Sequence, residues 1–283
     1  MTNKARADRW TPASLGCGSA WWSVGRFGFS VILLTALFSL IAIPWVDLRW
    51  WRIVRRCASI AAACSLWWCI RRLERRRFAD YGLRWSREAR RMTLVGAVAG
   101  AGALGILLAV GLAAGVYDIA LTPDRAKLWG TVLGFIPGAA LVAVLEELVF
   151  RGYLLQHWLG CSRWLALVAS SAVYAIVHIK TREFGGSLGM EITGLFVLGV
   201  VLALTVLWTH QLWLAIGLHA ALAYGAQVNR LVIAIPNSSL TWLVGSNRLI
   251  NGVAAWAALG LLAGIVWWWT HRTQQGGQAH AAH

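Results

Sequence analysis

Charged residues are scarce in this chain: only 13% of its 283 residues are Asp, Glu, Lys or Arg, whereas a soluble domain has about 25%. Hydrophobic residues make up 59% of the chain, and the mean hydropathy is +0.62. This composition excludes an ordinary water-soluble domain. It predicts an all-α, polytopic membrane protein, because a helix in lipid satisfies its own backbone polar groups.

Acidic residues are the rarer charge, with 11 Asp and Glu against 26 Lys and Arg, for a formal net charge of +15. This excess does not indicate a nucleic-acid partner, because 13 of the basic residues lie between Arg49 and Arg91 beside apolar spans. Arginine clusters of this kind are typical of cytoplasmic loops. We therefore expect residues 71–91 to be cytoplasmic and the protein to have no nucleic-acid partner. We expect its location to be a bacterial cytoplasmic (inner) membrane.

Cysteine patterns that indicate disulfides or zinc sites are also lacking. The five cysteines form no C-x-x-C pair and no Cys/His zinc spacing, their number is odd, and three of them share one apolar run. Such cysteines usually behave as small buried hydrophobic residues. We therefore expect the five cysteines to be small buried residues that form no disulfide: Cys17, Cys57, Cys64, Cys69 and Cys161.

Apolar stretches that could cross a bilayer recur along the whole chain. The stretch at 57–70 is short and bracketed by arginines, so the prediction is about eight transmembrane helices, or seven if this stretch does not cross. We expect an N-terminal tail at 1–26, one integral-membrane domain at 27–270 and a disordered tail at 271–283. The predicted spans are 27–46, 57–70, 92–116, 130–156, 164–179, 192–209, 212–228 and 252–270.

One span carries three charged residues, Glu146, Glu147 and Arg151. An ionised carboxylate within a membrane costs several kcal/mol, so such residues face a protein interior or a wet cavity and are usually functional. On a helix Glu147 and Arg151 lie one turn apart on the same face, which predicts an ion pair. Glu146 points about 100° away from Glu147 and has no cation on its own helix. It is therefore the better candidate for a general base.

Two histidines lie in later spans, His178 near the end of 164–179 and His219 within 212–228. Taken singly, each could be a hydrogen-bonded core residue. Two carboxylates, a guanidinium and two imidazoles on three helices are nevertheless what a bundle places around one cavity. The sequence therefore predicts a single polar site among residues 140–228, formed by Glu146, Glu147, Arg151, His178 and His219.

These motifs resemble those of the CPBP (Abi) family, the CAAX prenyl endopeptidases and bacteriocin-processing intramembrane proteases. The sequence E-E-L-V-F-R-G that starts at Glu146 resembles the first motif, E-E-x-x-x-R. The sequence Y-A-I-V-H that ends at His178 resembles F-x-x-x-H, with Tyr in place of Phe. The segment around His219 is similar to the one that carries H-x-x-x-N, but Ala223 stands where the family has Asn. The resemblance covers roughly residues 80–265.

The resemblance implies an intramembrane endopeptidase that hydrolyses a peptide bond in a membrane-associated protein or peptide. In this scheme Glu146 activates water, His178 helps to hold the water, and His219 supplies an oxyanion donor, while Glu147 and Arg151 order the site. Loss of one oxyanion donor costs about 10²-fold to 10³-fold in rate, which is the expected effect of Ala223. Gln227, one turn beyond Ala223, is a candidate substitute, and Tyr174 and Gln227 are candidate substrate contacts.

Other chemistries are less well supported. A serine mechanism lacks the G-x-S-x-G motif, and H-E-x-x-H is also absent. Zinc held by Glu146, His178 and His219 is the alternative to the metal-free mechanism that we favour, in which no cofactor is expected. The competing functions are a non-catalytic scaffold, chaperone or immunity factor with the same fold, and a transporter, for which one dense polar cluster is a poor fit. The sequence does not select the substrate or an oligomeric state.

Overall fold

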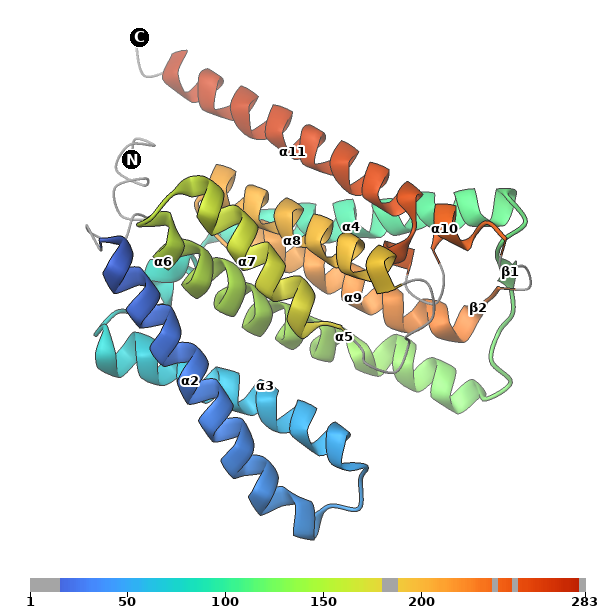
Figure 1. The fold of residues 1–283 in the computed structure, drawn as a ribbon. Coiled ribbons are helices and arrows are strands. Elements are labelled where there is room, and N and C mark those ends of the chain that lie inside the picture. The colour runs from blue at the N-terminus through green and yellow to red at the C-terminus, as the bar shows by residue number, and fades with distance from the viewer. Residues whose placement is uncertain (1–15, 180–187, 236–238, 246–248, 280–283) are drawn as a thin grey trace.

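The computed structural model describes residues 16–179, 188–235, 239–245 and 249–279, and most of them are helical (Figure 1). The all-α membrane bundle that the composition predicted is therefore confirmed. The long helices are α2 (Cys17–Ala42), α3 (Trp50–Trp68), α4 (Arg87–Ala113), α5 (Arg125–Glu147), α7 (Arg163–Val177), α8 (Leu188–Thr209), α9 (Trp213–Val232) and α11 (Val253–Ala279). The short elements are η1 (Ile43–Trp45), η2 (Cys69–Leu73), η3 (Phe78–Tyr81), β1 (Asp118–Ile119), η4 (Leu148–Leu154), α6 (Leu155–Leu159), β2 (Ile233–Ala234), α10 (Thr241–Val244) and η5 (Leu249–Asn251).

Each predicted span overlaps one of the eight long helices, although the bounds differ. Within the described residues, six helices are long and apolar enough to cross a membrane. The short stretch at 57–70 lies in one of these six, Trp50–Leu73, which has 24 residues because the helix continues through the flanking arginines. Helix α7 has 15 residues and is shorter than a usual span. Helix α9 has 20 residues, but polar residues such as Gln227 and Arg230 lower its hydropathy.

Helical structure extends into both segments that the sequence predicted as tails. Helix α2 begins at Cys17, within the expected N-terminal tail, because its first turns pack on α6 and bury Ala20 and Ser23. Helix α11 continues to Ala279, within the segment expected to be disordered. Residues 1–15 and 280–283 lie outside the described residues.

Helices α4 and α9 pack closely because glycines face the neighbouring backbone. A Cβ atom on Gly96 of α4 would lie 2.2 Å from the Leu214 carbonyl oxygen, and one on Gly217 of α9 would lie 2.0 Å from that of Thr93. Small residues allow this approach in membranes, where packing rather than the hydrophobic effect joins helices. The position of α9, which carries His219, is thus fixed by direct contact with α4.

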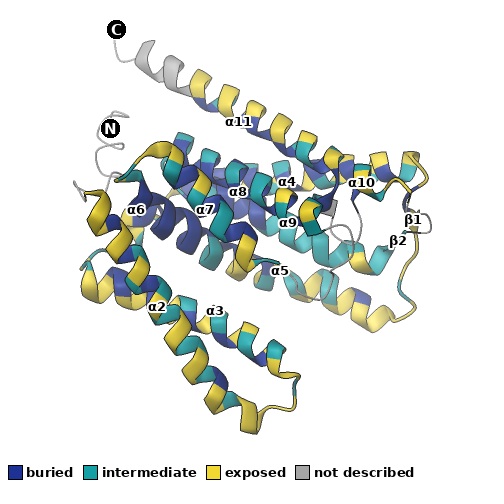
Figure 2. Ribbon diagram, in the orientation of Figure 1, coloured by how far each residue is buried: buried dark blue, intermediate teal, exposed yellow. Residues whose placement is uncertain are grey.

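The outer surface of the bundle is apolar. Large hydrophobic side chains such as Leu40 on α2, Leu141 on α5 and Leu261 on α11 are each 70% exposed. Figure 2 shows these helices with long exposed faces, while the helices at the centre of the bundle are mostly buried. An apolar surface of this extent would favour aggregation in water, but it matches the lipid around an integral membrane protein.

The expectation that the cysteines form no disulfide is wrong for one pair. Cys17 and Cys161 are bonded across 144 residues of sequence. The spacing could not reveal this pair, because only the packing of α2 against α6 brings the two residues together. Of the other cysteines, Cys57 and Cys69 are buried as expected, whereas Cys64 is exposed.

The opposite end of the bundle is closed by the short antiparallel pair of β1 and β2, in which Asp118 faces Ala234. Beside it, the hydroxyl of Tyr117 donates to the carbonyl of Val244 at 2.5 Å. Burial raises the pKa of Tyr117 to about 12, so this hydroxyl remains a donor at neutral pH. This hydrogen bond joins the connection after α4 to α10.

Candidate active site

The two motif carboxylates lie where α5 changes into the π-helix η4. The seven residues of η4, Leu148–Leu154, are all buried. Single turns of π-helix within α-helices frequently occur at functional sites. The chain therefore leaves regular α-helical geometry directly after Glu147, between the two carboxylates and Arg151.

Glu147 and Arg151 form the ion pair that their spacing predicted. Arg151 Nη1 donates to Glu147 Oε1 at 2.9 Å, and both side chains are fully buried. Arg151 Nη2 donates to the carbonyl of Gly199 on α8 at 3.1 Å, and the guanidinium lies 4.5 Å from the centre of the Tyr174 ring. The guanidinium thus joins three helices, and removing it would leave a buried carboxylate without its cation.

Glu147 also orients His219. His219 Nδ1 lies 2.7 Å from Glu147 Oε1, the same oxygen that accepts from Arg151. An ionised carboxylate only accepts, so the hydrogen-bond network assigns the proton to Nδ1. The opposite nitrogen, Nε2, faces Glu146, with its Oε2 3.6 Å away.

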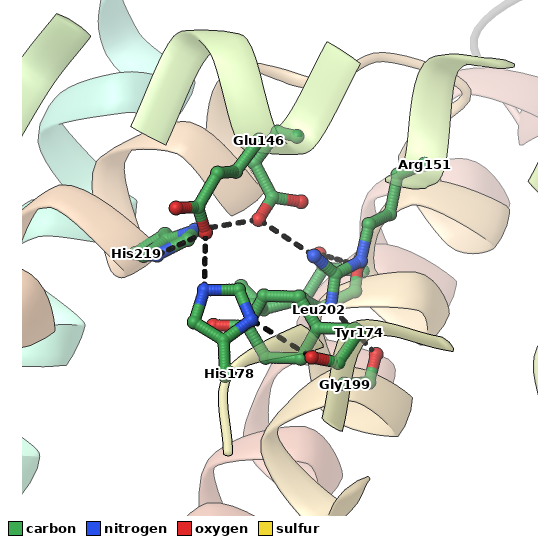
Figure 3. A network of polar contacts seen from close by, with 9 residues as sticks. Glu146, Arg151, Tyr174, His178, Gly199, Leu202 and His219 are labelled. Carbon is green, nitrogen blue, oxygen red and sulfur yellow. Dashed lines mark hydrogen bonds and ion pairs between the residues drawn. The ribbon is translucent and has the colours of Figure 1, made fainter. Parts of the chain in front are cut away.

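Glu146 meets both imidazoles at one oxygen (Figure 3). Its Oε2 lies 3.0 Å from His178 Nε2 and 3.6 Å from His219 Nε2. The side chains of Glu146 and His178 are 24% and 27% exposed, whereas that of Glu147 is fully buried. The two adjacent carboxylates therefore occupy different environments. Of the two carboxylates only Glu146 is partly exposed, although its Oε2 is buried against the imidazoles.

The contact between Glu146 and His178 is a hydrogen bond only if a proton lies between the two facing atoms. His178 Nδ1 lies 2.8 Å from the carbonyl of Tyr174, which can only accept, so this nitrogen carries a hydrogen. Nε2 therefore has a lone pair when the ring is neutral. A separation of 3.0 Å from a carboxylate oxygen is favourable only when the ring or the carboxyl group carries one more proton.

The structure brings the five predicted catalytic residues into one cluster, but it places the secondary candidates differently. Tyr174 is 2% exposed, and its ring packs on Arg151 and His178. It therefore helps to hold these two side chains in place. Ala223 and Gln227 are half-buried on α9. They lie about 6 and 12 Å along the helix axis from His219, so Ala223 is much nearer to the site than Gln227. Substrate contact by Tyr174 or Gln227 remains a prediction.

The residues considered for zinc contact one another directly, since both Nε2 atoms approach the same oxygen of Glu146. Within the described part of the chain, no group of three or more His, Cys, Asp and Glu residues is arranged to hold a metal ion. Zinc dependence therefore remains a matter for experiment.

Sequence reasoning missed several residues near the site. Gly199 supplies a backbone acceptor to Arg151, and no motif identifies such a role. Glu191 lies just before the predicted span 192–209, but it is 2% exposed at the start of α8. His157 has a buried polar contact with Glu74, and the pattern Tyr153-x-x-x-His157, which repeats the second motif, could have indicated it.

Comparison with known families agrees with this geometry. Residues 128–225 match the family model Rce1-like, described as Type II CAAX prenyl endopeptidase Rce1-like. This match confirms the resemblance to the CPBP family, over the part of the chain that carries all five predicted catalytic residues. Residues 128–225 are therefore similar in sequence to the CAAX prenyl endopeptidases, and the apolar helices indicate an integral membrane protein. A search of curated proteins gave no match.

Proposed function

We propose that this protein is an intramembrane endopeptidase in which Glu146 activates water without a metal ion. The observation that supports this most is the contrast between the two adjacent carboxylates. Glu146 is partly exposed and contacts His178 and His219, whereas Glu147 is sealed against Arg151. A general base must reach its water, while a residue that orders the site need not.

In the proposed reaction, water binds beside Glu146 and His178. Glu146 accepts a proton from this water as the oxygen attacks the carbonyl carbon of the peptide bond. The carbonyl oxygen becomes negatively charged in the tetrahedral intermediate, and a protonated His219 Nε2, held by Glu147, donates to it. The proton on the Glu146 and His178 pair then passes to the amide nitrogen. The C–N bond breaks and leaves a carboxyl group and an amine.

The substrate is proposed to be a membrane-associated protein or peptide, because the cluster lies among apolar spans. The family description suggests a prenylated CAAX sequence as the first candidate. We place the protein in a bacterial cytoplasmic membrane, with the arginines between Arg71 and Arg91 on the cytoplasmic side. No cofactor is required by this scheme.

The test is Glu146→Gln, which keeps the shape of the side chain and removes the base. Membranes that contain the wild-type protein should produce new peptide N-termini and cleave a fluorogenic farnesylated CAAX peptide. The variant should lose about 10²-fold to 10⁴-fold of this activity while its melting temperature stays near that of the wild type. Peptide N-termini are counted by mass spectrometry, which requires no knowledge of the substrate.

The matched control is Glu88→Gln, which changes a partly exposed glutamate on α4 away from the cluster. It should leave cleavage unchanged. If Glu146→Gln keeps wild-type activity, or if the wild type produces no new N-termini, the endopeptidase proposal fails in favour of a scaffold. If a chelator abolishes the activity and zinc restores it, the metal-free mechanism is wrong.

A further inference from the structure

A second buried pair of glutamate and histidine lies outside the candidate active site. His157, on α6, has its Nδ1 2.8 Å from the carbonyl of Tyr153 and its Nε2 3.0 Å from Glu74 Oε1. The hydroxyl of Tyr81 donates to the other oxygen of Glu74. Both ring nitrogens of His157 face hydrogen-bond acceptors. The two contacts can therefore both be hydrogen bonds only when each nitrogen carries a proton.

The geometry of this pair repeats that of His178. In both cases Nδ1 lies 2.8 Å from the carbonyl of the tyrosine four residues earlier, and Nε2 lies 3.0 Å from a glutamate oxygen. The exposure differs, because the side chains of His157 and Glu74 are 1% and 15% exposed, against 27% for His178. A substrate cannot reach so closed a pair. The second pair therefore joins two parts of the chain, and it does not repeat the proton transfer that the scheme assigns to Glu146 and His178.

One of these parts is the connector between α3 and α4, residues 74–84. It contacts the helix of the motif carboxylates through the bond of Glu74 to His157. The Tyr81 ring also stacks on His157, with centroids 6.2 Å apart and planes inclined by 15°. At its other end the connector contacts α9. The amide of Leu212 donates to the Gly82 carbonyl at 3.1 Å.

A second bond strengthens the contact with α9, since Trp213 Nε1 donates to the Arg84 carbonyl at 2.9 Å. Gly82 has φ of +93°, and a Cβ there would lie 3.1 Å from the Leu212 side chain. A residue other than glycine would therefore be strained and crowded at this position. The connector thus joins the helix that carries Glu146 to the helix that carries His219.

The helix of the motif carboxylates needs such support. The rod that runs from Arg125 to Leu159 contains Pro137, which removes a backbone hydrogen bond, and the π-helix η4. Helices bend at prolines and at π-turns. The segment with Glu146 lies between these two interruptions. It packs directly on α9, where Glu147 bonds to His219, and contacts at the end of the rod add a second constraint on its direction.

We propose that Glu74 and His157 are positioning residues, which hold the connector on α6 and thereby set the placement of Glu146 relative to His219. This inference rests on the proposed endopeptidase function for its kinetic consequence. Its structural part, the distance between α5 and α9, does not depend on that function. The two parts are therefore measured separately.

The negative charge of Glu74 strengthens its contact with His157. Burial by itself raises the pKa of Glu74, but the hydrogen bond from His157 and its positive charge, with the bond from Tyr81, outweigh burial. The pKa of Glu74 consequently lies below its usual value, and the residue is ionised at neutral pH. A carboxylate that meets a doubly protonated imidazole forms a strong, directional contact.

The experiment compares Glu74→Ala and Glu74→Gln with the wild type, in the full protein with Cys64→Ser to remove the exposed thiol. Spin labels at Leu141→Cys on α5 and Arg230→Cys on α9, both exposed, report the distance between these helices. Glu74→Ala should broaden the distance distribution, and Glu74→Gln, which keeps an acceptor for His157, should broaden it less. With the farnesylated CAAX peptide, Glu74→Ala should lower kcat about tenfold per folded molecule and leave KM unchanged.

The control is Tyr117→Phe, which removes a buried hydrogen bond at the opposite end of the bundle. It should lower the melting temperature but change neither the distance distribution nor kcat. A Glu74→Ala variant with a wild-type distance distribution would overturn the proposal. If the wild type does not cleave the peptide, the endopeptidase function fails for that substrate, while the distances still decide whether Glu74 positions the two helices.

Discussion

At the scale of single residues, the site depends on the different surroundings of two adjacent glutamates. Because successive helical residues point about 100° apart, Glu147 turns into the core and Glu146 turns toward the imidazoles. Glu147 has Arg151 and His219 on one oxygen, whereas Glu146 remains partly exposed. One dipeptide thereby supplies a buried, ion-paired carboxylate and a partly exposed one.

Ala223 leads to the first prediction. It stands one turn after His219, where the CPBP family has Asn, so the site lacks a second oxyanion donor from this position. Ala223→Asn should raise kcat about tenfold or more, because one oxyanion donor contributes about 10²-fold to 10³-fold in other hydrolases. The rate of peptide cleavage measures the gain. The gain should disappear in the Glu146→Gln background, and no gain in the single variant would contradict this role for position 223.

Glu74 leads to a prediction about pH. Its pKa in the folded protein lies below the usual 4.5, so its ionised form stabilises the fold above that pH. This contribution is lost as the pH falls through the lowered pKa. The groups that face Glu74 are His157, Tyr81 and Tyr153. Wild type should melt higher than Glu74→Gln at pH 6, and the gap should close below about pH 4.5. A gap that does not change with pH would contradict this origin.

At the scale of elements, α2 and α3 form a hairpin that is attached to the bundle mainly at one end. Helix α2 contacts α6, and the hairpin diverges from the other helices toward η1 (Figure 1). The attachment includes the disulfide between Cys17 and Cys161, the pair of Glu74 and His157, and the Tyr153 hydroxyl, which donates to the Ser23 carbonyl. These contacts act on the end of the helix that carries the motif carboxylates.

We predict that the disulfide stabilises this attachment. Cys17→Ser, Cys161→Ser and the double variant should each lower the free energy of unfolding by the same amount, about 2–4 kcal/mol, because each removes the same bond. Unfolding in detergent, with and without reductant, measures the effect. Cys64→Ser is the control and should have no effect, since Cys64 is exposed and unbonded. Additive effects of the two cysteine variants would show that they do not form one bond.

At the scale of the whole molecule, the structure shows which loops share an end of the bundle. The contact of Glu74 with His157 and the disulfide of Cys17 with Cys161 place the arginine-rich residues 71–91 at the same end as the start of α2. Arginine clusters favour the cytoplasmic side, whereas stable disulfides favour an oxidising compartment. The two signals disagree, and we expect the nine arginines to determine the orientation.

This orientation is testable by labelling intact cells with a membrane-impermeant maleimide. Arg77→Cys, at the arginine-rich end, should be protected from the reagent, and Leu121→Cys, in the loop between α4 and α5, should react. Both positions are exposed, so access to the reagent and not burial should decide the result. The reverse pattern would contradict the predicted orientation and would place the disulfide in the oxidising compartment.

Much of this protein follows from its sequence. Low charge and long apolar runs determined an all-α membrane bundle, because lipid requires the backbone to satisfy its own hydrogen bonds. The four-residue spacing determined the pair of Glu147 and Arg151, since that spacing aligns residues on one helix face. The motif around Glu146 indicated the similarity to the CAAX prenyl endopeptidases that the family model matches over residues 128–225.

The tertiary structure decided what depends on contacts between distant segments. Only the packing of α5, α7 and α9 brings Glu146, His178 and His219 together, and only the fold of α2 onto α6 joins Cys17 to Cys161. The same holds for Glu74 and His157, which are 83 residues apart. Periodicity and propensity describe neighbours along the chain, so they do not specify which helix faces meet. That is set by close glycine contacts and buried polar pairs between elements.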